Sequence, residues 1–285
     1  MNIPKKIWTF WDKKKLPDTV EKCVKTWRFF NPNYEINVIS MKTIKTWLPE
    51  VDIKNFIHAK ENNYTRLSDF VRIYVLYKYG GIWIDSSTIC TQSFDDWFET
   101  IRRKHRGGKK IEYIGFYSSQ FTSKKRYKVI ENWFFACPKH SRFIKKWRDT
   151  FTEIEDYDRV EDWLEDVEEL GVDFQKIPDF DDPEYLAQHI AAQKVLQYYK
   201  YPQNGIVLFD ATETALKYRL FRRGRLSVEQ RVKRLCKDYD FWAKTPIIKF
   251  TGDDRREMES SRKLSNCVFG HWKNMIATLL TGIET

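Results

Sequence analysis

Residues 66–87 read RLSDFVRIYVLYKYGGIWIDSS, and this stretch contains the clearest structural signal in the chain. Apolar side chains recur every three or four residues, which predicts a helix over residues 66–79. The two glycines that follow are typical of a helix C-terminus. Residues 82–84 then form a short apolar run that predicts a buried strand, with Asp85 at its carboxyl end.

The elements on either side of this stretch predict an α/β fold. A strand, a helix and a second strand are expected at 5–11, 17–30 and 35–39, an order typical of the beginning of a parallel sheet. Further strands are expected at 111–116, 133–137, 206–209 and 246–250, and further helices at 140–152, 186–200 and 227–238. We therefore expect one domain over residues 1–285, with a helical, charge-rich insertion at 150–240.

The charge of the chain is unevenly distributed. The net charge is +10, yet residues 153–184 are acidic and residues 217–237 are basic. A basic balance suits an anionic partner, which could be a nucleic acid, an anionic membrane surface or a phosphorylated substrate. Composition does not choose among these partners.

Five cysteines lie far apart in the sequence, without the spacing of a zinc site. They therefore predict reduced thiols and a cytoplasmic protein. We find no pattern typical of a signal peptide and no apolar run of the roughly 20 residues that span a bilayer. The expectation is a soluble protein, or one bound peripherally to the inner face of a membrane.

A group of charged residues is predicted to meet at the end of the strand. Asp69 and Arg72 are three residues apart on the expected helix and so share a face, with Arg66 one turn earlier. Asp85 ends the strand, and ligands of open α/β sheets bind at the carboxyl ends of strands. Carboxylates bind sugar hydroxyls and arginine pairs with phosphate, which points to a ligand with hydroxyls and a diphosphate. The alternative is a surface ion pair that contributes little.

The run SDFVRIYVLYKYGGIWID resembles the signature of glycosyltransferases with a DXD sugar-binding region. These include capsular polysaccharide synthesis proteins and, more distantly, the clostridial glucosylating toxins. The segments IPKKIWTFWDKKKLP and ENWFFACPKHSRFIKKW resemble the same family, as does PIIKFTG more faintly. The resemblance implies a GT-A fold, with a Rossmann-like mixed sheet flanked by helices. It also implies transfer of a hexose, with retention, from a nucleotide sugar, usually a UDP-sugar, to a glycan or lipid-linked acceptor in polysaccharide synthesis.

The resemblance also implies roles for individual residues. Asp69 and Arg72 would hold the donor sugar and its phosphates, and Asp85 would be the first acidic residue of the DXD element, so these three are the predicted catalytic residues. The predicted donor-binding residues also include Arg66, Trp11 against the nucleobase, and two residues near the C-terminus that would close over the donor, His271 and Trp272. Ser87 and Lys249 complete this predicted set. Trp11 packing in the core, and a structural His271, are the alternatives.

The sequence departs from the family pattern where a metal ion would bind. The DXD element reads Asp85-Ser86-Ser87, so a hydroxyl replaces the second carboxylate, and a hydroxyl is a poor ligand for Mn²⁺ or Mg²⁺. Lys249 stands where related enzymes have a metal-binding histidine. Two hypotheses stay open: Asp85 still holds a divalent metal, or Lys249 and an arginine neutralise the diphosphate without one.

Three other functions remain as alternatives. A catalytically inactive module of the same fold could bind a glycan or a protein, which the Asp-Ser-Ser sequence keeps open. A transferase that modifies a protein is the second. The third is nucleic-acid binding through residues 217–237, in which Tyr218 and Phe221 would stack on bases. The spacing of these two residues is equally typical of a helix face that packs on a core, so we expect no nucleic acid partner.

Overall fold

The computed structural model describes residues 2–53, 56, 64–105, 110–177, 183–221, 224–237 and 246–270. The chain forms two compact units, each assembled from three separate stretches of sequence. The first unit contains Met1–Lys14, Tyr34–Asp85 and His105–Ala211, and the second contains Lys15–Asn33, Ser86–Lys104 and Thr212–Thr285. The chain therefore passes from the first unit to the second directly after Asp85.

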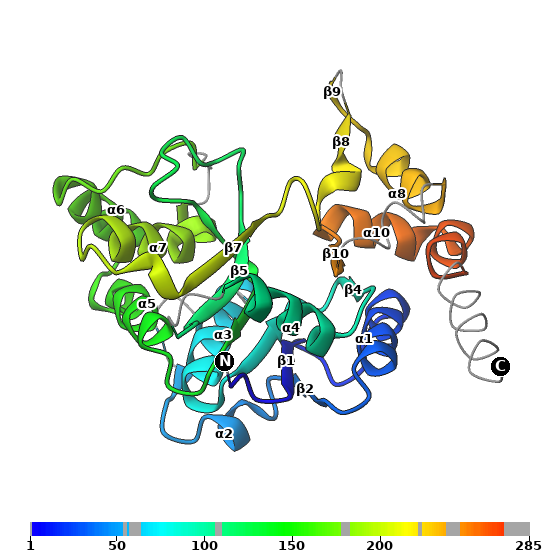
Figure 1. The fold of residues 1–285 in the computed structure, drawn as a ribbon, viewed down its shortest axis with the longest axis horizontal. Coiled ribbons are helices and arrows are strands. Elements are labelled where there is room, and N and C mark those ends of the chain that lie inside the picture. Colours follow the sequence, from blue (N-terminus) through cyan, green and yellow to red (C-terminus); the bar gives the residue numbers. More distant parts are fainter. Residues whose placement is uncertain are drawn as a thin grey trace. The chain divides into compact units, whose positions relative to one another are not determined.

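The first unit is built on a six-stranded sheet (Figure 1). Its strands are β1 (Lys6–Phe10), β2 (Glu35–Ile39), β3 (Gly81–Ile84), β5 (Tyr113–Tyr117), β6 (Ile130–Cys137) and β7 (Ile206–Asp210). They lie in the order β2-β1-β3-β6-β5-β7, and β6 pairs antiparallel with both of its neighbours while the other pairs are parallel. The carboxyl ends of β1, β2, β3, β5 and β7 thus meet at one edge, together with the amino end of β6.

Helix α3 (Tyr64–Tyr79) is the helix that the sequence predicts over residues 66–79. It packs against β1 and β3 and also against α5 (Arg142–Thr152). Because it lies between these neighbours, both its apolar residues and its charged residues Arg66, Asp69 and Arg72 are buried. A helix with one solvent-facing polar side would have left this charged group at the surface.

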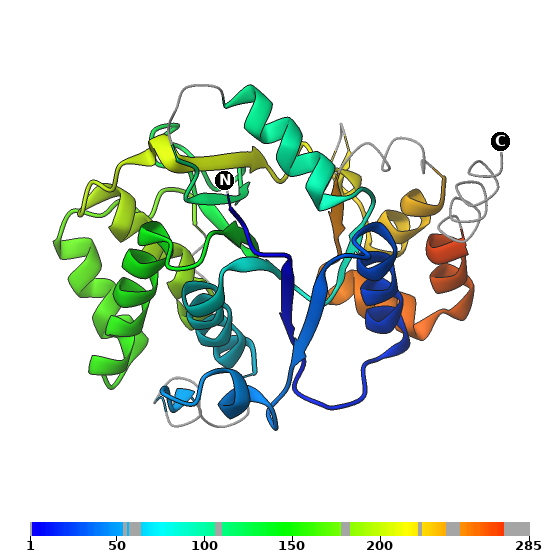
Figure 2. The same ribbon diagram turned by 60° about the horizontal axis from the view of Figure 1, so that its bottom comes forward.

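The other helices of the first unit gather around α3 and α5. They are α2 (Ile44–Trp47), α6 (Val160–Glu169) and α7 (Ala187–Gln197), with the 3₁₀ helices η3 (Glu153–Asp156), η4 (Pro183–Leu186) and η5 (Gln203–Gly205). Helix α7 packs against α5 and β6, and α5 and α7 lie side by side in both ribbon views (Figures 1 and 2). Aromatic rings fill the core between α5 and strands β5 and β6, where Tyr113 and Trp147 contact each other and both contact Phe135 and Phe143.

The second unit has two small sheets and a group of helices. Its elements are α1 (Asp18–Phe30), β4 (Thr88–Cys90), α4 (Phe94–Lys104), η6 (Lys217–Arg219), β8 (Leu220–Phe221), β9 (Gly224–Arg225), α8 (Val228–Lys237), β10 (Ile247–Lys249), α10 (Gly252–Ser260) and a helix at 262–270. Strand β4 pairs antiparallel with β10, and β8 with β9. Helix α10 begins with a capping box in which Thr251 and Asp254 satisfy each other's backbone N–H groups.

The predicted elements are confirmed, with small shifts at their ends. Each strand and helix expected from the sequence is present, and the α/β class with a mixed, helix-flanked sheet is confirmed. The stretch 150–240 divides between the units after Ala211, so α6 and α7 belong with the six-stranded sheet. A single domain with an acceptor-side insertion at 150–240 stays a prediction. Among the described residues, no helix is both long and apolar enough to cross a bilayer.

Gly81 joins α3 to β3 in a backbone conformation that favours glycine, with φ of +98°. A Cβ atom at this position would lie 2.5 Å from the carbonyl oxygen of Lys6, so an alanine would have both backbone strain and a clash. We expect Gly81→Ala to lower the free energy of unfolding by about 3 kcal/mol. The measurement is equilibrium unfolding in urea.

Gly171 is the matched control for this prediction. Its φ is +80°, but a Cβ atom there would meet no atom within 4 Å. Gly171→Ala should therefore lower the free energy of unfolding by about 1 kcal/mol, which is the cost of the backbone conformation alone. Equal losses in the two variants would contradict the account of the α3–β3 junction.

Candidate functional site

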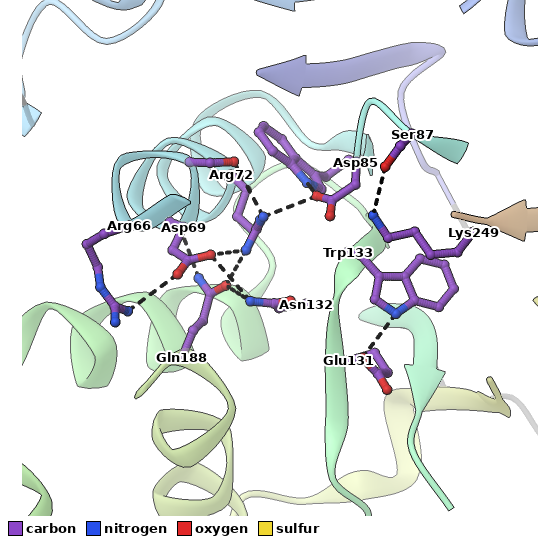
Figure 3. Close-up of polar contacts among 12 residues, drawn as sticks. Arg66, Asp69, Arg72, Asp85, Ser87, Glu131, Asn132, Trp133, Gln188 and Lys249 are labelled. Carbon is purple, nitrogen blue, oxygen red and sulfur yellow. Dashed lines mark hydrogen bonds and ion pairs between the residues drawn. The ribbon is translucent and has the colours of Figure 1, made fainter. Parts of the chain in front are cut away.

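Asp69 and Arg72 lie at the centre of a buried network of charged side chains on α3 (Figure 3). Arg72 Nη1 donates a short hydrogen bond to Asp69 Oδ1, and Arg66 Nη1 lies 3.3 Å from Asp69 Oδ2. The side chains of Asp69 and Arg72 are only 2% and 5% exposed. This burial excludes the surface ion pair that was the alternative from sequence, because surface pairs keep their contact with solvent.

Asp85 extends the network from the carboxyl end of β3. Arg72 Nη2 donates to Asp85 Oδ1 over 3.1 Å, and the indole N–H of Trp83 donates to the same oxygen over 3.1 Å. The guanidinium of Arg72 also lies over the ring of Trp83, 5.3 Å from its centroid. The Asp85 side chain is 26% exposed, so the network reaches solvent at the sheet edge where ligands of such folds bind.

Gln188 and Asn132 complete the network from two other elements of the first unit. Gln188, on α7, donates from Nε2 to the backbone oxygen of Asp69 over 2.9 Å and accepts from Arg72 Nη1 over 2.9 Å. Asn132, on β6, donates to Gln188 Oε1 over 3.1 Å and lies 3.3 Å from Asp69 Oδ1. Figure 3 shows both side chains directed at the Asp69–Arg72 pair.

Sequence reasoning did not identify Gln188, Asn132 or Trp83. Gln188 is 116 residues away from its partner Arg72, and nothing in the local sequence links the two positions. Helix α7 also contains His189, Gln193, Lys194 and Gln197, so a glutamine at position 188 gives no distinct signal in the sequence.

Burial and charge act on Asp69 in opposite directions. Loss of solvent raises the pKa of the Asp69 carboxyl, and the nearby guanidinium groups of Arg72 and Arg66 oppose that rise. A buried carboxylate of this kind needs its cationic partners, because an unpaired buried charge costs several kcal/mol. The network therefore holds the Arg72 guanidinium in one orientation, with Asp69, Gln188, Ser68 and Asp85 as hydrogen-bond partners and Trp83 beneath it.

The other predicted donor-binding residues lie in several places. Trp11 directly follows β1 in the first unit, and its backbone N–H donates to Ile39 over 2.9 Å. Ser87 and Lys249 belong to the second unit, where Lys249 Nζ lies 3.4 Å from Ser87 Oγ, which donates to the backbone oxygen of Phe250. Their part in donor binding stays a prediction. His271 and Trp272 lie outside the described residues.

Asp85 is the candidate ligand for a divalent metal. In the described part of the chain, no three side chains of His, Cys, Asp or Glu gather into a set that could hold a metal ion. Asp85 Oδ1 already accepts hydrogen bonds from Arg72 and Trp83. Metal binding by Asp85 stays a prediction.

The protein is therefore an α/β protein in which a network of charged side chains ends at the carboxyl edge of the sheet. Residues 1–164 match the family model of the capsular polysaccharide synthesis proteins. This match covers more than half of the chain, and the chain belongs to that family. The family resemblance found in the sequence is thus confirmed. No curated protein sequence matches the chain.

Several solved structures are similar to this one at low sequence identity. The UDP-bound glycosyltransferase domain from the YGT toxin is 11% identical, with 95% of this chain and 91% of that chain covered and a TM-score of 0.48. A glycosyltransferase involved in the glycosylation of the major capsid of PBCV-1 is 14% identical, with 90% and 98% covered and a TM-score of 0.40. The catalytic domain of alpha-toxin from Clostridium novyi is 11% identical, with 90% and 76% covered and a TM-score of 0.38.

The class of enzyme predicted from the sequence, a glycosyltransferase, is confirmed by the family to which the chain belongs. The network of Asp69, Arg72 and Asp85 is consistent with such an enzyme, because it combines one phosphate-binding cation with two carboxylates.

Proposed function

We propose that this chain is a retaining glycosyltransferase of GT-A type that moves a hexose from a UDP-sugar to a glycan or lipid-linked acceptor in polysaccharide synthesis. The observation that carries the proposal is the buried hydrogen-bond network from Asp69 through Arg72 to Asp85. It supports an arginine fixed for phosphate binding, beside a carboxylate that is partly open to solvent.

Each member of the network has a part in this proposal. Arg72 binds the diphosphate and stabilises the charge that develops there as the donor bond breaks. Asp69 orients Arg72 and binds hydroxyls of the donor sugar. Asp85 binds the ribose at the end of β3, and Arg66 supports Asp69 from the preceding turn of α3.

The reaction requires no nucleophile from the protein. The acceptor hydroxyl oxygen attacks the anomeric carbon from the face that the phosphate leaves, and the bond between that carbon and the phosphate oxygen breaks. The electron pair stays with the diphosphate, and the acceptor proton passes to a diphosphate oxygen. The protein contributes charge stabilisation and orientation, which are the main sources of rate enhancement in such transfers.

The second unit carries most of the net positive charge of the chain, which supports an anionic acceptor or membrane partner. Counted over the sequence, this unit has 23 Lys and Arg against 14 Asp and Glu, while the first unit has 27 against 26. Nine of the ten net positive charges therefore belong to the second unit. We propose that it faces an anionic membrane surface or a lipid-pyrophosphate acceptor, since basic surfaces bind anionic lipids.

The test of the proposed function is a panel of nucleotide sugars. Thermal unfolding of the protein would be followed with UDP, several UDP-sugars, and GDP- and dTDP-sugars, each in EDTA and in Mn²⁺. Bound donor at 100 times its dissociation constant contributes about 2.7 kcal/mol of stability. Stabilisation by one UDP-sugar, above that given by the other nucleotides, is the expected result. No stabilisation by any donor would leave a protein that does not bind nucleotide sugars.

The role of Lys249 decides whether we expect donor hydrolysis to depend on a metal ion. If its ammonium group neutralises the diphosphate, donor hydrolysis in EDTA should keep at least about half of its rate in Mn²⁺, and Lys249→Ala in EDTA should lose about tenfold or more. Lys237→Ala, which removes an exposed lysine of the same unit, is the matched control. Complete loss of wild-type activity in EDTA, restored by Mn²⁺, would show a metal in this role instead.

A further inference from the structure

Tyr185 is a large aromatic side chain that the fold holds in an exposed position. It lies in η4 and is 54% exposed, although the next two residues, Leu186 and Ala187, are buried. The short helix η4 packs against α3 and α7. The backbone of Tyr185 is therefore anchored between these helices, while its ring contributes little to the core.

Tyr185 is close to the charged network described above. Gln188, three residues further along the chain, is hydrogen bonded to Asp69 and Arg72. Burial of part of the side chain raises the pKa of the Tyr185 hydroxyl, and the carboxylates of Asp85 and Asp69 raise it further. Because η4 packs against α3 and α7, the helices that carry Asp69, Arg72 and Gln188, the exposed ring borders the charged network.

Glu131 approaches the same region from β6, where it directly precedes the network residue Asn132. Its Oε2 accepts a hydrogen bond from the indole N–H of Trp133 over 3.0 Å, as Figure 3 shows, and lies 3.9 Å from His189 Nε2. Its side chain is 13% exposed. Asp69 and Asp85 both pair with an arginine, but no lysine or arginine in the described part of the chain forms an ion pair with Glu131.

This combination of side chains fits a pyranose ring. One face of a pyranose carries C–H groups that pack on an aromatic ring, while its edge carries hydroxyls that donate to carboxylates. An exposed phenol ring near a fixed carboxylate that has no lysine or arginine partner in the described part of the chain presents both surfaces together. A Tyr185 ring that served only to pack the core would not be half exposed. A Glu131 carboxylate that served only in an ion pair would have a lysine or arginine partner.

We propose that Tyr185 and Glu131 form the subsite for the sugar ring of the donor. The phenol ring of Tyr185 packs on the C–H face of the pyranose, and Glu131 accepts a hydrogen bond from one of its hydroxyls. This inference rests on the proposed function, because it names the part of a nucleotide sugar that these two residues contact. The nucleotide and its phosphates lie on Arg72 and Asp85 and do not depend on Tyr185.

The test compares the binding of UDP with that of UDP-glucose, UDP-galactose and UDP-N-acetylglucosamine by calorimetric titration. Tyr185→Ala should raise Kd for the preferred UDP-sugar about tenfold and change Kd for UDP by less than about twofold. Glu131→Gln should weaken UDP-sugar binding in the same selective way. Tyr185→Phe should bind like the wild type, because the ring and not the hydroxyl makes the contact. Tyr198→Ala, which removes another exposed tyrosine, should also bind like the wild type.

The possible failures are distinguishable. If the wild type binds a UDP-sugar but Tyr185→Ala binds it equally well, the subsite is wrong and the proposed function stands. If Tyr185→Ala weakens UDP and UDP-sugar equally, Tyr185 contacts the nucleotide, which also overturns the inference. If the wild type binds neither UDP nor any UDP-sugar, the proposed function fails and the subsite fails with it.

Discussion

Arg72→Lys is expected to lower the rate of donor hydrolysis by about 10²–10³-fold, although it keeps the positive charge. Arg72 bonds at once to Asp69, Gln188 and Asp85, through two terminal nitrogens that are fixed in one plane. A lysine ammonium at the end of a flexible chain cannot keep this geometry and also present a donor to a phosphate oxygen. The measurement is the steady-state rate of UDP release from the UDP-sugar.

The size of the loss distinguishes orientation from charge. If Arg72 acted only as a nearby positive charge, lysine would restore most of the rate, and a loss below about fivefold would show this. Thermal unfolding of the variant checks that the loss is not one of folding. A rate that falls while the midpoint of unfolding stays within a few degrees is the result that the network predicts.

Asp69→Asn is expected to have the second large effect, on both activity and stability. The substitution keeps the shape of the side chain but leaves the buried guanidinium groups of Arg66 and Arg72 without their shared carboxylate. Breaking a buried ion pair on one side costs about 3–5 kcal/mol. We expect unfolding at a lower urea concentration, together with loss of about 10²-fold or more in donor hydrolysis.

Glu112→Gln is the matched control for Asp69→Asn. Glu112 precedes β5, is buried, and is paired with Arg142 and with the hydroxyl of Tyr201, so its replacement also removes a paired carboxylate of the first unit. It contacts no member of the site network. This variant should lose stability and keep the rate of donor hydrolysis per folded molecule. If Asp69→Asn also kept that rate, Asp69 would be a structural residue only.

The sequence predicted well that Asp69, Arg72 and Asp85 come together, because the signal for this arrangement is local. Only about twenty residues contain α3, the two glycines and β3. This short spacing brings Asp69, Arg72 and Asp85 together at the end of β3. Contacts between adjacent elements follow from periodicity and from the direction of the chain. The Arg72–Asp85 hydrogen bond, across 13 residues, is of this kind.

The remainder of the site depends on long-range packing, which periodicity does not encode. Gln188 comes to Arg72 because α7 packs on α5 and β6, and Asn132 because β6 runs antiparallel beside β3. The amphipathic pattern of α3 also predicted a polar face, but α5 covers that helix as well, so the charged residues became buried. The division of the chain after Asp85 has no sequence signal, because no linker composition marks it.

We propose that the Asp69–Arg72–Asp85 network binds the donor. UDP release from UDP-sugars in the absence of acceptor tests this proposal directly. The wild type, Glu112→Gln, Arg72→Lys and Asp69→Asn would be compared at equal concentrations of folded protein. We predict hydrolysis of one UDP-sugar by the wild type and by Glu112→Gln, and a loss of about 10²-fold or more in the other two variants. Equal rates in all four proteins, or no UDP release by the wild type from any UDP-sugar, would contradict the proposal.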